Sequence, residues 1–316
     1  MAGIKIFVDG QEGTTGLLIH ERLQKRDDLE ILMIDPAKRK DPKERSKYIN
    51  QADVVFLCLP DDAARESVSL AENPSVRIID ASTAHRISDG WVYGIPELSK
   101  EHRKAIENSK RVSVPGCFAT GFNMLMYPLV KEGFVPPDYP ASCHAVTGYS
   151  GGGRKLISIF ESEENKQKLR SPCFYSLGLH HKHLPEMQKH SGLLNPPVFT
   201  PIVCNFYQGM TVAVPLCTDL FRKKATAAEI SLFYNSYYQD QKFVKLFPYN
   251  IQEEFEWGYL NAESCNFTNN IEILSFGDEK QVLVAARLDN LGKGASGAAI
   301  QNMNIMLGME ESCGLI

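Results

Sequence analysis

The chain has 316 residues, 43% of them hydrophobic and 23% charged, with a formal net charge of −4 and an isoelectric point near 6.1. These values are ordinary for a globular protein that works in water, and they give no sign of a nucleic-acid partner. Chains longer than about 250–300 residues usually divide into domains, so we expect two domains that share a cleft.

The apolar segments are too short for a membrane protein. The longest, such as residues 54–60, have the length of a β-strand and fall far short of a bilayer span. The N-terminal residues lead straight into a strand and leave no room for a signal peptide, so we expect no membrane partner and a cytoplasmic location. Eight cysteines without a CxxC pair argue against a zinc ribbon, and we expect most of them to be reduced, buried thiols.

The first third of the chain alternates between strand-like and helix-like segments. This alternation predicts βαβ units and a parallel sheet, that is, an α/β, Rossmann-like domain. We expect strands at 4–10, 29–35, 53–60, 77–82 and 111–115, helices at 14–26 and 61–73, and a basic loop at 34–45.

The remainder of the chain has a different pattern. Apolar, β-branched runs with few helices between them predict a second α/β domain with a mixed, largely antiparallel sheet. These runs lie at 142–148, 196–206, 209–220, 271–278 and 281–290. Residues 295–307 are rich in small residues and have a helical pattern, whereas the acidic tail at 309–316 has no capping signal and is expected to fray.

A glycine-rich turn follows the first strand and opens the first helix. Its GxxGxxG pattern differs from the commoner GxGxxG, but it supplies a tight turn, close backbone approach and free helix N–H groups for a pyrophosphate. We therefore favour cofactor binding over a plain βα turn. The candidate residues are Gly10, Gly13, Thr14, Thr15 and Gly16.

The loop after the second strand bears on the choice between NAD and NADP. Asp35 could bond a ribose hydroxyl, which favours NAD, whereas Lys38 and Arg39 could neutralise a 2′-phosphate, which favours NADP. We predict NADP, and the alternative is an ordinary solvated charged loop.

Cys117 follows a Pro-Gly turn and begins an amphipathic helix. The positive end of a helix dipole favours a thiolate, so this position predicts a nucleophile. A lone cysteine is more often an inert apolar residue, and we expect that of Cys58, Cys204 and Cys217, which lie in apolar strands.

A thiolate nucleophile needs a proton-transfer partner, and the densest histidine cluster is His180, His181 and His183. In an extended segment His181 and His183 would share one face, and Pro185 with Glu186 suits the first turn of the next helix. A metal site is less favoured because few further ligands lie at suitable spacing, and a histidine-rich surface loop is the third interpretation.

Several motifs together resemble the N-acetyl-gamma-glutamyl-phosphate reductase family, in its short, type 2 form. They are the glycine turn, VPGCFATG around Cys117, HHKHLPEM at 180–187, DASTAHR at 80–86, YGIPEL at 93–98, TGYSGGGRK at 147–155 and DNLGKGASGAAIQNMN at 289–304. The resemblance extends from the first strand to the last helix, and unrelated Rossmann proteins would not carry these blocks in this order.

The resemblance implies a fold, a reaction and roles for particular residues. It implies an NADP-binding domain over 1–116 completed by a C-terminal helix at 291–316, and a catalytic and dimerisation domain over 117–290, in a homodimer or homotetramer. The implied reaction in arginine biosynthesis reduces an acyl phosphate with NADPH to N-acetylglutamate semialdehyde and phosphate. Cys117 matches the nucleophile that forms a thioacyl intermediate, and His181 or His183 matches the acid/base residue.

Further residues are candidates for binding the substrate or the cofactor. Phosphate needs cationic or hydroxyl donors, which makes Arg86, Arg154, Ser82 and Thr83 substrate-binding candidates, although either arginine could instead form a structural ion pair. Glu186 could bind the substrate amide, orient a histidine or favour a helix start. Asn290 and Lys293 are cofactor-binding candidates, with a packed helix start as the alternative.

Two rival functions use the same features. Aspartate-semialdehyde dehydrogenase has the same chemistry with a shorter substrate, a difference that motifs resolve poorly. A non-catalytic NADP-sensing protein would keep the nucleotide domain, but it would be expected to lose the thiol or the histidines, and this chain keeps both.

Overall fold

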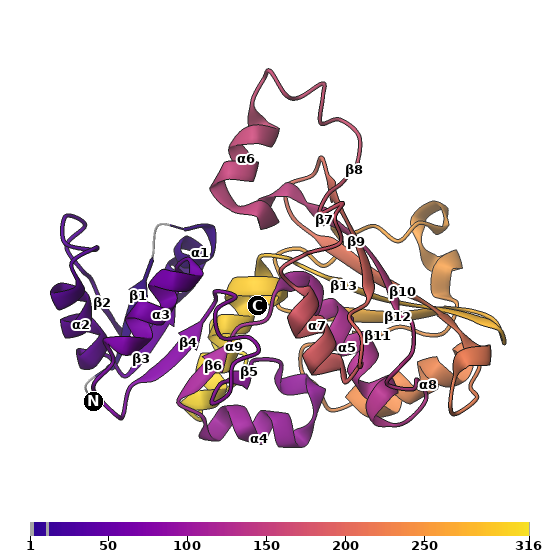
Figure 1. Cartoon of the computed structure of the whole chain (residues 1–316), viewed down its shortest axis with the longest axis horizontal. Coiled ribbons are helices and arrows are strands. Elements are labelled where there is room, and N and C mark those ends of the chain that lie inside the picture. The colour runs from indigo at the N-terminus through magenta and orange to yellow at the C-terminus, as the bar shows by residue number, and fades with distance from the viewer. Residues whose placement is uncertain (1–2, 11–12, 316) are drawn as a thin grey trace. The chain divides into compact units, whose positions relative to one another are not determined.

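The computed structural model describes residues 3–10 and 13–315, which form two compact units (Figure 1). Unit 1 consists of Met1–Pro115 together with Ala295–Ile316, and unit 2 consists of Gly116–Gly294. Within the described residues, no helix has both the length and the apolar character needed to cross a bilayer.

Unit 1 contains a parallel six-stranded sheet in the order β2-β1-β3-β4-β6-β5. The central strands are buried on both faces, as expected where helices cover a parallel sheet. The chain passes from β1 to β2 on one side and then to β3 on the other, which creates a switch point between β1 and β3, where α/β folds bind ligands. The strands are β1 (Ile4–Asp9), β2 (Leu29–Leu32), β3 (Val54–Leu57), β4 (Arg77–Asp80), β5 (Val92–Tyr93) and β6 (Arg111–Ser113).

The helices of unit 1 are α1 (Thr14–Leu23), α2 (Pro42–Gln51), α3 (Asp61–Ser69), α4 (Lys100–Asn108) and α9 (Gly297–Met306). Helix α2 begins inside the segment expected to be a basic loop, so that expectation was wrong over residues 42–45. Asp41 caps the helix by accepting a hydrogen bond from the Lys43 N–H, and Pro42 occupies the first turn. The Asp41 cap and Pro42 favour a helix more strongly than the run of charged residues favours a loop.

The C-terminal tail packs against unit 1, and the expectation that it would fray was wrong. The Arg26 guanidinium, which is 7% exposed, donates to the Asn304 amide oxygen at 2.7 Å and to the Cys313 carbonyl at 3.5 Å. Arg103 donates to both carboxylate oxygens of Glu311, at 2.9 and 3.1 Å. Long-range side chains therefore hold a tail that lacks a local capping signal.

Unit 2 contains a mixed seven-stranded sheet in the order β11-β12-β13-β10-β7-β9-β8. Only the β11–β12 and β7–β9 pairs are parallel, so the sheet is largely antiparallel and the predicted fold class is confirmed. Its strands are β7 (Ser142–Gly148), β8 (Cys173–Phe174), β9 (Val198–Cys204), β10 (Met210–Cys217), β11 (Val244–Leu246), β12 (Ile271–Gly277) and β13 (Gln281–Leu288), and its helices are α5 (Cys117–Lys131), α6 (Gly153–Glu161), α7 (Leu184–Ser191) and α8 (Ala227–Tyr238).

Helix α5 packs on the centre of this sheet. Gly121 permits the contact, because a Cβ there would lie 2.7 Å from the Val212 side chain on β10. The hydroxyls of Tyr234 and Tyr238 on α8 donate to the carbonyls of Leu125 and Met124 in α5, both at 2.6 Å. These contacts hold α5 rigidly, which matters because its first residue is Cys117.

The cysteines are more exposed than expected. All eight are thiols, but only Cys143 and Cys265 are buried. Cys217 is exposed at the end of β10, and Cys58 and Cys204 are half-buried, because each of the three lies just after or at the last position of its strand. Apolar neighbours in the sequence do not reveal where a strand ends.

Candidate active site

Cys117 is the first residue of α5 and is half-buried. The preceding Gly116 adopts an extended conformation and places no side chain over the helix start, so the N–H groups of the first turn have no side-chain cap. The first N–H with a partner in the helix is that of Thr120, which donates to the Gly116 carbonyl at 2.8 Å. This open, positive helix end favours the thiolate form of Cys117 and can stabilise negative charge next to it.

His181 and His183 lie together beside the residue that follows Cys117. Their rings are 4.7 Å apart, and the Phe118 ring is 5.7 Å from His181 and 5.8 Å from His183. The segment is a turn and not the extended stretch that we expected, and the turn, not strand alternation, brings the two rings together.

The surroundings of the two histidines differ. His183 is 5% exposed, whereas His181 is half-buried and can exchange protons with solvent. The Nδ1 atom of His181 accepts a hydrogen bond from the His183 backbone N–H at 3.1 Å, so a neutral His181 carries its proton on Nε2. His180 is exposed.

Glu186 links the histidine segment to the start of α5. As expected, Pro185 and Glu186 lie in the first turn of α7. The Glu186 side chain is 2% exposed; its Oε2 accepts a hydrogen bond from the Gly116 N–H at 3.0 Å, and its Oε1 lies 4.0 Å from His183 Nε2. This geometry fits an orienting role, one of the three that the sequence left open.

Tyr175 is a residue of this site that the sequence did not single out. Its ring lies 5.8 Å from the His181 ring in an edge-on contact. Burial, and to a lesser degree the nearby Cys117, raises the pKa of the Tyr175 phenol, so the phenol stays a neutral hydrogen-bond donor at physiological pH. No sequence signal marks this tyrosine, because its role depends on the fold of residues 173–183.

The described residues of the glycine turn in unit 1 are Gly10 and residues 13–16. Gly10 has φ +89°, and a Cβ there would lie 2.4 Å from the Cys58 carbonyl oxygen, so only glycine fits. Helix α1 follows Gly13 without a side-chain cap. Thr14, Thr15 and Gly16 form its first turn, and Gln11 and Glu12 lie outside the described residues. The residues present fit a bound pyrophosphate at this turn.

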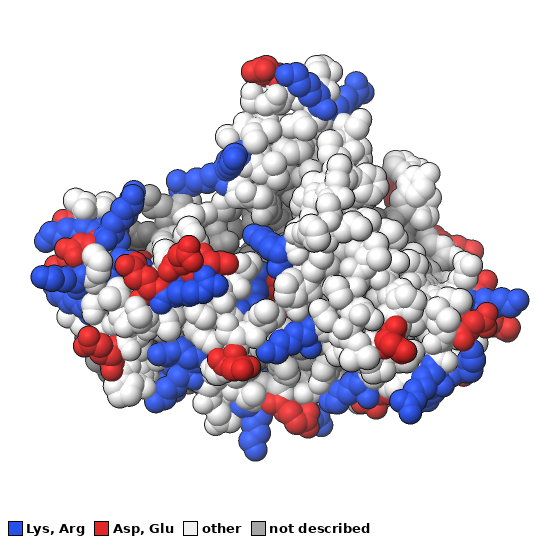
Figure 2. Space-filling view, in the orientation of Figure 1, with Lys and Arg blue, Asp and Glu red and all other residues white. Residues whose placement is uncertain are grey.

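The loop that bears on cofactor choice is exposed. The Asp35 carboxylate accepts a hydrogen bond from the Ala37 N–H at 2.9 Å and so closes a local turn. Lys38 and Arg39 are exposed next to it. Figure 2 shows Lys and Arg side chains beside Asp and Glu over the β2–α2 part of unit 1.

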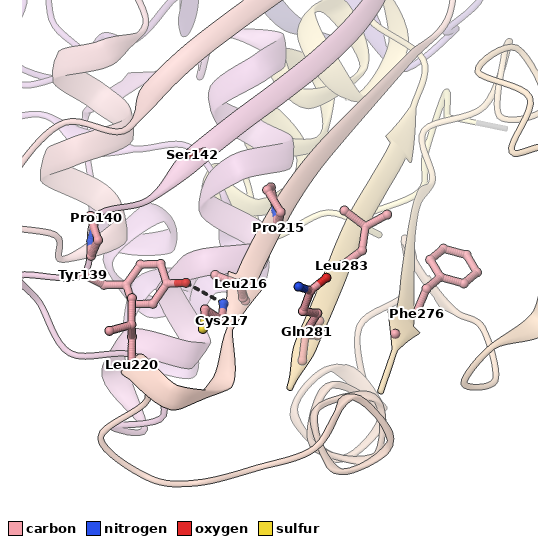
Figure 3. Close-up of a pocket in the computed structure, with 12 residues that line it drawn as sticks. Tyr139, Pro140, Ser142, Pro215, Leu216, Cys217, Leu220, Phe276, Gln281 and Leu283 are labelled. Atoms are coloured by element: carbon pink, nitrogen blue, oxygen red, sulfur yellow. Dashed lines mark hydrogen bonds between the residues drawn. The ribbon is translucent and has the colours of Figure 1, made fainter. Parts of the chain in front are cut away.

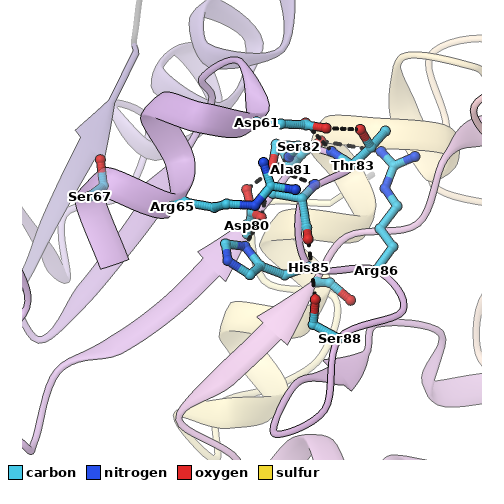
Figure 4. Close-up of polar contacts among 12 residues, drawn as sticks. Asp61, Arg65, Ser67, Asp80, Ala81, Ser82, Thr83, His85, Arg86 and Ser88 are labelled. Carbon is cyan, nitrogen blue, oxygen red and sulfur yellow. Dashed lines mark hydrogen bonds and ion pairs between the residues drawn. The ribbon is translucent and has the colours of Figure 1, made fainter. Parts of the chain in front are cut away.

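The predicted phosphate-binding residues Ser82, Thr83 and Arg86 lie at the carboxyl end of β4, in unit 1 (Figure 4). The hydroxyl of Ser82 donates to Asp80 at 2.8 Å and that of Thr83 donates to Asp61 at 2.5 Å. The buried Arg86 donates to the Val114 carbonyl at 2.9 Å and the Ala81 carbonyl at 3.3 Å.

His85 completes this loop, because its Nδ1 lies 2.6 Å from Asp80 and its ring stacks on Trp91 at 4.1 Å. Ser82, Thr83 and Arg86 thus have structural partners in the loop and in neighbouring segments of unit 1.

The remaining predicted residues lie in unit 2. Arg154 is exposed near the start of α6. Asn290 is buried, accepts a hydrogen bond from the Gly209 N–H at 2.7 Å and donates to the Ser150 hydroxyl at 3.0 Å. Lys293 is 2% exposed, and its ammonium lies 5.8 Å from the Phe243 ring. Asn290 and Lys293 are therefore packed inside the unit that holds Cys117.

Two family models match the chain: the semialdehyde dehydrogenase NAD-binding domain at residues 16–106 and the semialdehyde dehydrogenase dimerisation domain at residues 117–290. The chain is 48% identical to N-acetyl-gamma-glutamyl-phosphate reductase 2 of Nostoc sp., over 98% of this chain and 99% of that protein. It is 45% identical to N-acetyl-gamma-glutamyl-phosphate reductase 2 of Pseudomonas putida, over 98% of both chains.

The chain belongs to the N-acetyl-gamma-glutamyl-phosphate reductase family. It is therefore a reductase of the semialdehyde dehydrogenase type with a nicotinamide-cofactor domain, as the resemblance predicted.

Solved structures agree on the fold. Aspartate semialdehyde dehydrogenase II of Vibrio cholerae has a TM-score of 0.72 at 14% identity, with 98% of this chain and 99% of that chain covered. The Francisella tularensis aspartate semialdehyde dehydrogenase has a TM-score of 0.71 at 15% identity, over 96% and 100% of the chains. At such identities the likeness shows the fold alone, and neither rival function is favoured for this member of the reductase family.

A pocket of about 650 Å³ lies at one end of the unit 2 sheet (Figure 3). The residues that line it carry no charge, and none of them is a predicted site residue. Across the pocket wall, the Tyr139 hydroxyl accepts a hydrogen bond from the Cys217 N–H at 2.8 Å. No histidine, carboxylate or basic side chain is among the described residues that line it, in contrast to the surroundings of Cys117.

Proposed function

We propose that this chain reduces N-acetyl-gamma-glutamyl phosphate to N-acetylglutamate semialdehyde and phosphate, with NADPH as the reductant. The observation that carries the proposal is Cys117 at an uncapped helix start, with His181 and His183 both packed on the adjacent Phe118. The curated relatives with this substrate in their names match almost the full chain.

The first half-reaction forms a thioester. The Cys117 thiolate attacks the acyl carbon of the substrate, the C–S bond forms, and the C–O bond to the phosphate breaks, so that phosphate leaves with the electron pair. The N–H groups of the first α5 turn, which lacks a side-chain cap, can donate to the oxyanion that forms during the attack.

The second half-reaction releases the aldehyde. A bound nicotinamide supplies a hydride to the thioester carbon. As the C–S bond breaks, a protonated histidine stabilises the departing thiolate of Cys117. We assign this role to His181, because it is half-buried and presents Nε2 as its donor, while the buried His183 supports its ring.

The cofactor would lie along the glycine turn of unit 1. The backbone at Gly10, Gly13, Thr14, Thr15 and Gly16 would hold the pyrophosphate at the start of α1. We propose NADP because the exposed Lys38 and Arg39 can neutralise a 2′-phosphate, whereas Asp35 uses one carboxylate oxygen in its local turn. The cofactor roles of Asn290 and Lys293 stay predictions.

We further propose a cofactor domain and a catalytic and dimerisation domain as predicted, at residues 1–116 with 291–316 and at residues 117–290; Gly116 and residues 291–294 belong to unit 2, so these boundaries shift by one and four residues. Arg154 is a candidate for the substrate phosphate, since its exposed guanidinium belongs to the same unit as Cys117. The substrate-binding roles of Ser82, Thr83, Arg86 and Glu186 also stay predictions.

We infer a homo-oligomer that assembles through the unit 2 sheet. Helix α5 covers the face of the sheet that contains Val212. On the opposite face, apolar side chains such as those of Pro215, Leu283 and Val198 are exposed. An apolar sheet surface of this kind is typical of a subunit interface. All eight cysteines are thiols, which supports a reducing, cytoplasmic location.

The test is the reverse reaction with N-acetylglutamate semialdehyde, phosphate and NADP, followed by the appearance of NADPH, with Cys117→Ser alongside. We expect phosphate-dependent turnover that the variant lacks. Activity with aspartate semialdehyde alone would move the substrate to the rival dehydrogenase. NADP binding without turnover of either aldehyde would overturn the catalytic assignment.

A further inference from the structure

We propose that Gly294 is a positioning residue for Cys117, and that the loop 289–294 is a rigid wall that holds the nucleophile in place. A Cβ built on Gly294 would lie 2.7 Å from the Cβ of Cys117 and 3.3 Å from its Cα. Real Cβ contacts essentially never fall below 3.0 Å, so any side chain at this position would displace one of the two backbones.

The backbone of residues 289–294 cannot easily move away from Cys117, because hydrogen bonds hold it in place. The Asp289 carboxylate is 1% exposed and accepts hydrogen bonds from the Leu291 N–H at 2.8 Å and the Phe267 N–H at 2.8 Å, and from the Gln208 amide. The Gly294 N–H donates to the Asp289 carbonyl at 2.9 Å, which closes the loop on itself.

A second anchor follows directly in the sequence. The Asn290 side chain bonds both the Gly209 N–H and the Ser150 hydroxyl, and so joins the loop to two further segments of unit 2. Buried polar groups that are satisfied in this way favour one conformation strongly. The loop therefore has little freedom to move away from Cys117.

A further contact holds the residue before Cys117. The Glu186 carboxylate accepts the Gly116 N–H at 3.0 Å, which fixes the residue before the nucleophile. With Gly116 bonded to Glu186 and Gly294 packed against Cys117, the thiol has a preset position at the start of α5. To reach an ordinary contact distance of 3.4 Å, an alanine at 294 would have to push Cys117 away by about 0.7 Å.

This inference rests on the proposed function only in taking Cys117 as the nucleophile, so its test measures the thiol directly. We would compare Gly294→Ala with Gly178→Ala, whose added Cβ meets nothing closer than the His180 ring at 3.6 Å. The rate of iodoacetamide alkylation would be followed against pH on the Cys117 peptide by mass spectrometry, since the exposed Cys217 also reacts.

Where the alkylation rate of Cys117 no longer rises with pH, this thiol is fully ionised, so the plateau rate reports its position and access, not its ionisation. A misplacement of about 1 Å at a reacting group can cost about a hundredfold in catalysis, so we expect Gly294→Ala to lose about ten- to a hundredfold in kcat and to change the plateau alkylation rate, which reports the access of the reagent to the displaced thiol. Gly178→Ala should stay within about twofold of the wild type, and both proteins should keep the wild-type circular dichroism spectrum.

If Gly294→Ala does not fold, Asp289→Asn decides the matter. The asparagine keeps the volume but places an NH₂ group against one of the N–H donors, which loosens the wall without a clash. A changed plateau rate together with a lowered kcat in the folded variant supports the proposal. Wild-type plateau rates in the folded variants would overturn it, whether or not the protein proves to be a reductase.

Discussion

The two units each contain a helix that begins after a glycine and has no side-chain cap, and the two starts have different surroundings. Gly13, before α1, is exposed and places no side chain over the helix start. Gly116, before α5, is buried, and its N–H is held by Glu186. The same positive helix end can therefore serve a cofactor phosphate in one unit and a cysteine thiolate in the other, according to what surrounds it.

The largest difference between the two helix starts is expected when the thiol of Cys117 is removed. We expect Cys117→Ser to lower kcat by more than about a thousandfold, because an alcohol is a far weaker nucleophile at neutral pH, and to leave NADP affinity within about twofold. Steady-state kinetics and isothermal titration calorimetry measure the two effects. A comparable loss of NADP affinity would contradict the assignment of cofactor binding to the start of α1 and of the nucleophile to the start of α5.

The histidine assignment can be tested within the same unit. We expect His181→Asn to lower kcat by about a hundred- to ten-thousandfold, the usual contribution of a general acid. His183→Asn should cost less, because His183 acts through the ring of its neighbour. The pH dependence of kcat decides between them: if the histidine limb of the profile disappears in His183→Asn and survives in His181→Asn, the roles are reversed.

A substitution in the glycine turn before α1 should weaken NADP binding, which a substitution of Cys117 should leave unchanged. In Gly10→Ala, the added Cβ would lie 2.4 Å from a backbone oxygen, at a φ of +89° that alanine rarely adopts. We expect weaker NADP binding and a loss of about 1–3 kcal/mol of folding stability. Calorimetry and denaturant unfolding are the measurements, and Gly178→Ala is the control. Unchanged NADP affinity in the variant would remove the turn from the cofactor site.

A smaller effect concerns Tyr175, whose pKa is raised mainly by burial. Because the folded-state pKa exceeds the unfolded one, its contribution to stability is complete below about pH 10 and is lost as the pH rises further. The wild type should therefore lose more stability than Tyr175→Phe between about pH 10 and 12. Parallel pH dependences of the unfolding midpoint in the two proteins would show that the phenol is not buried.

Much of the architecture could be predicted because it depends on local patterns. The alternation of strands and helices, the helix that begins at Cys117 and the first turn of α7 at Pro185 follow from periodicity and capping preferences. Helix α2 was missed because a run of charges concealed its Asp41 cap. The tail at 309–315 was misjudged because Arg26 and Arg103, which hold it, are distant in sequence.

By itself, the sequence determined the fold class and the family and predicted Cys117 as the nucleophile, since these depend on hydrophobic periods and on motifs that are short and contiguous. The tertiary structure decided which groups meet. It brought Glu186 to the turn before Cys117, Tyr175 to His181, and Gly294 to the nucleophile itself. The reason is physical: the position of a thiol is set by packing and hydrogen bonds between segments that are far apart along the chain, and spacing in the sequence carries no record of those distances.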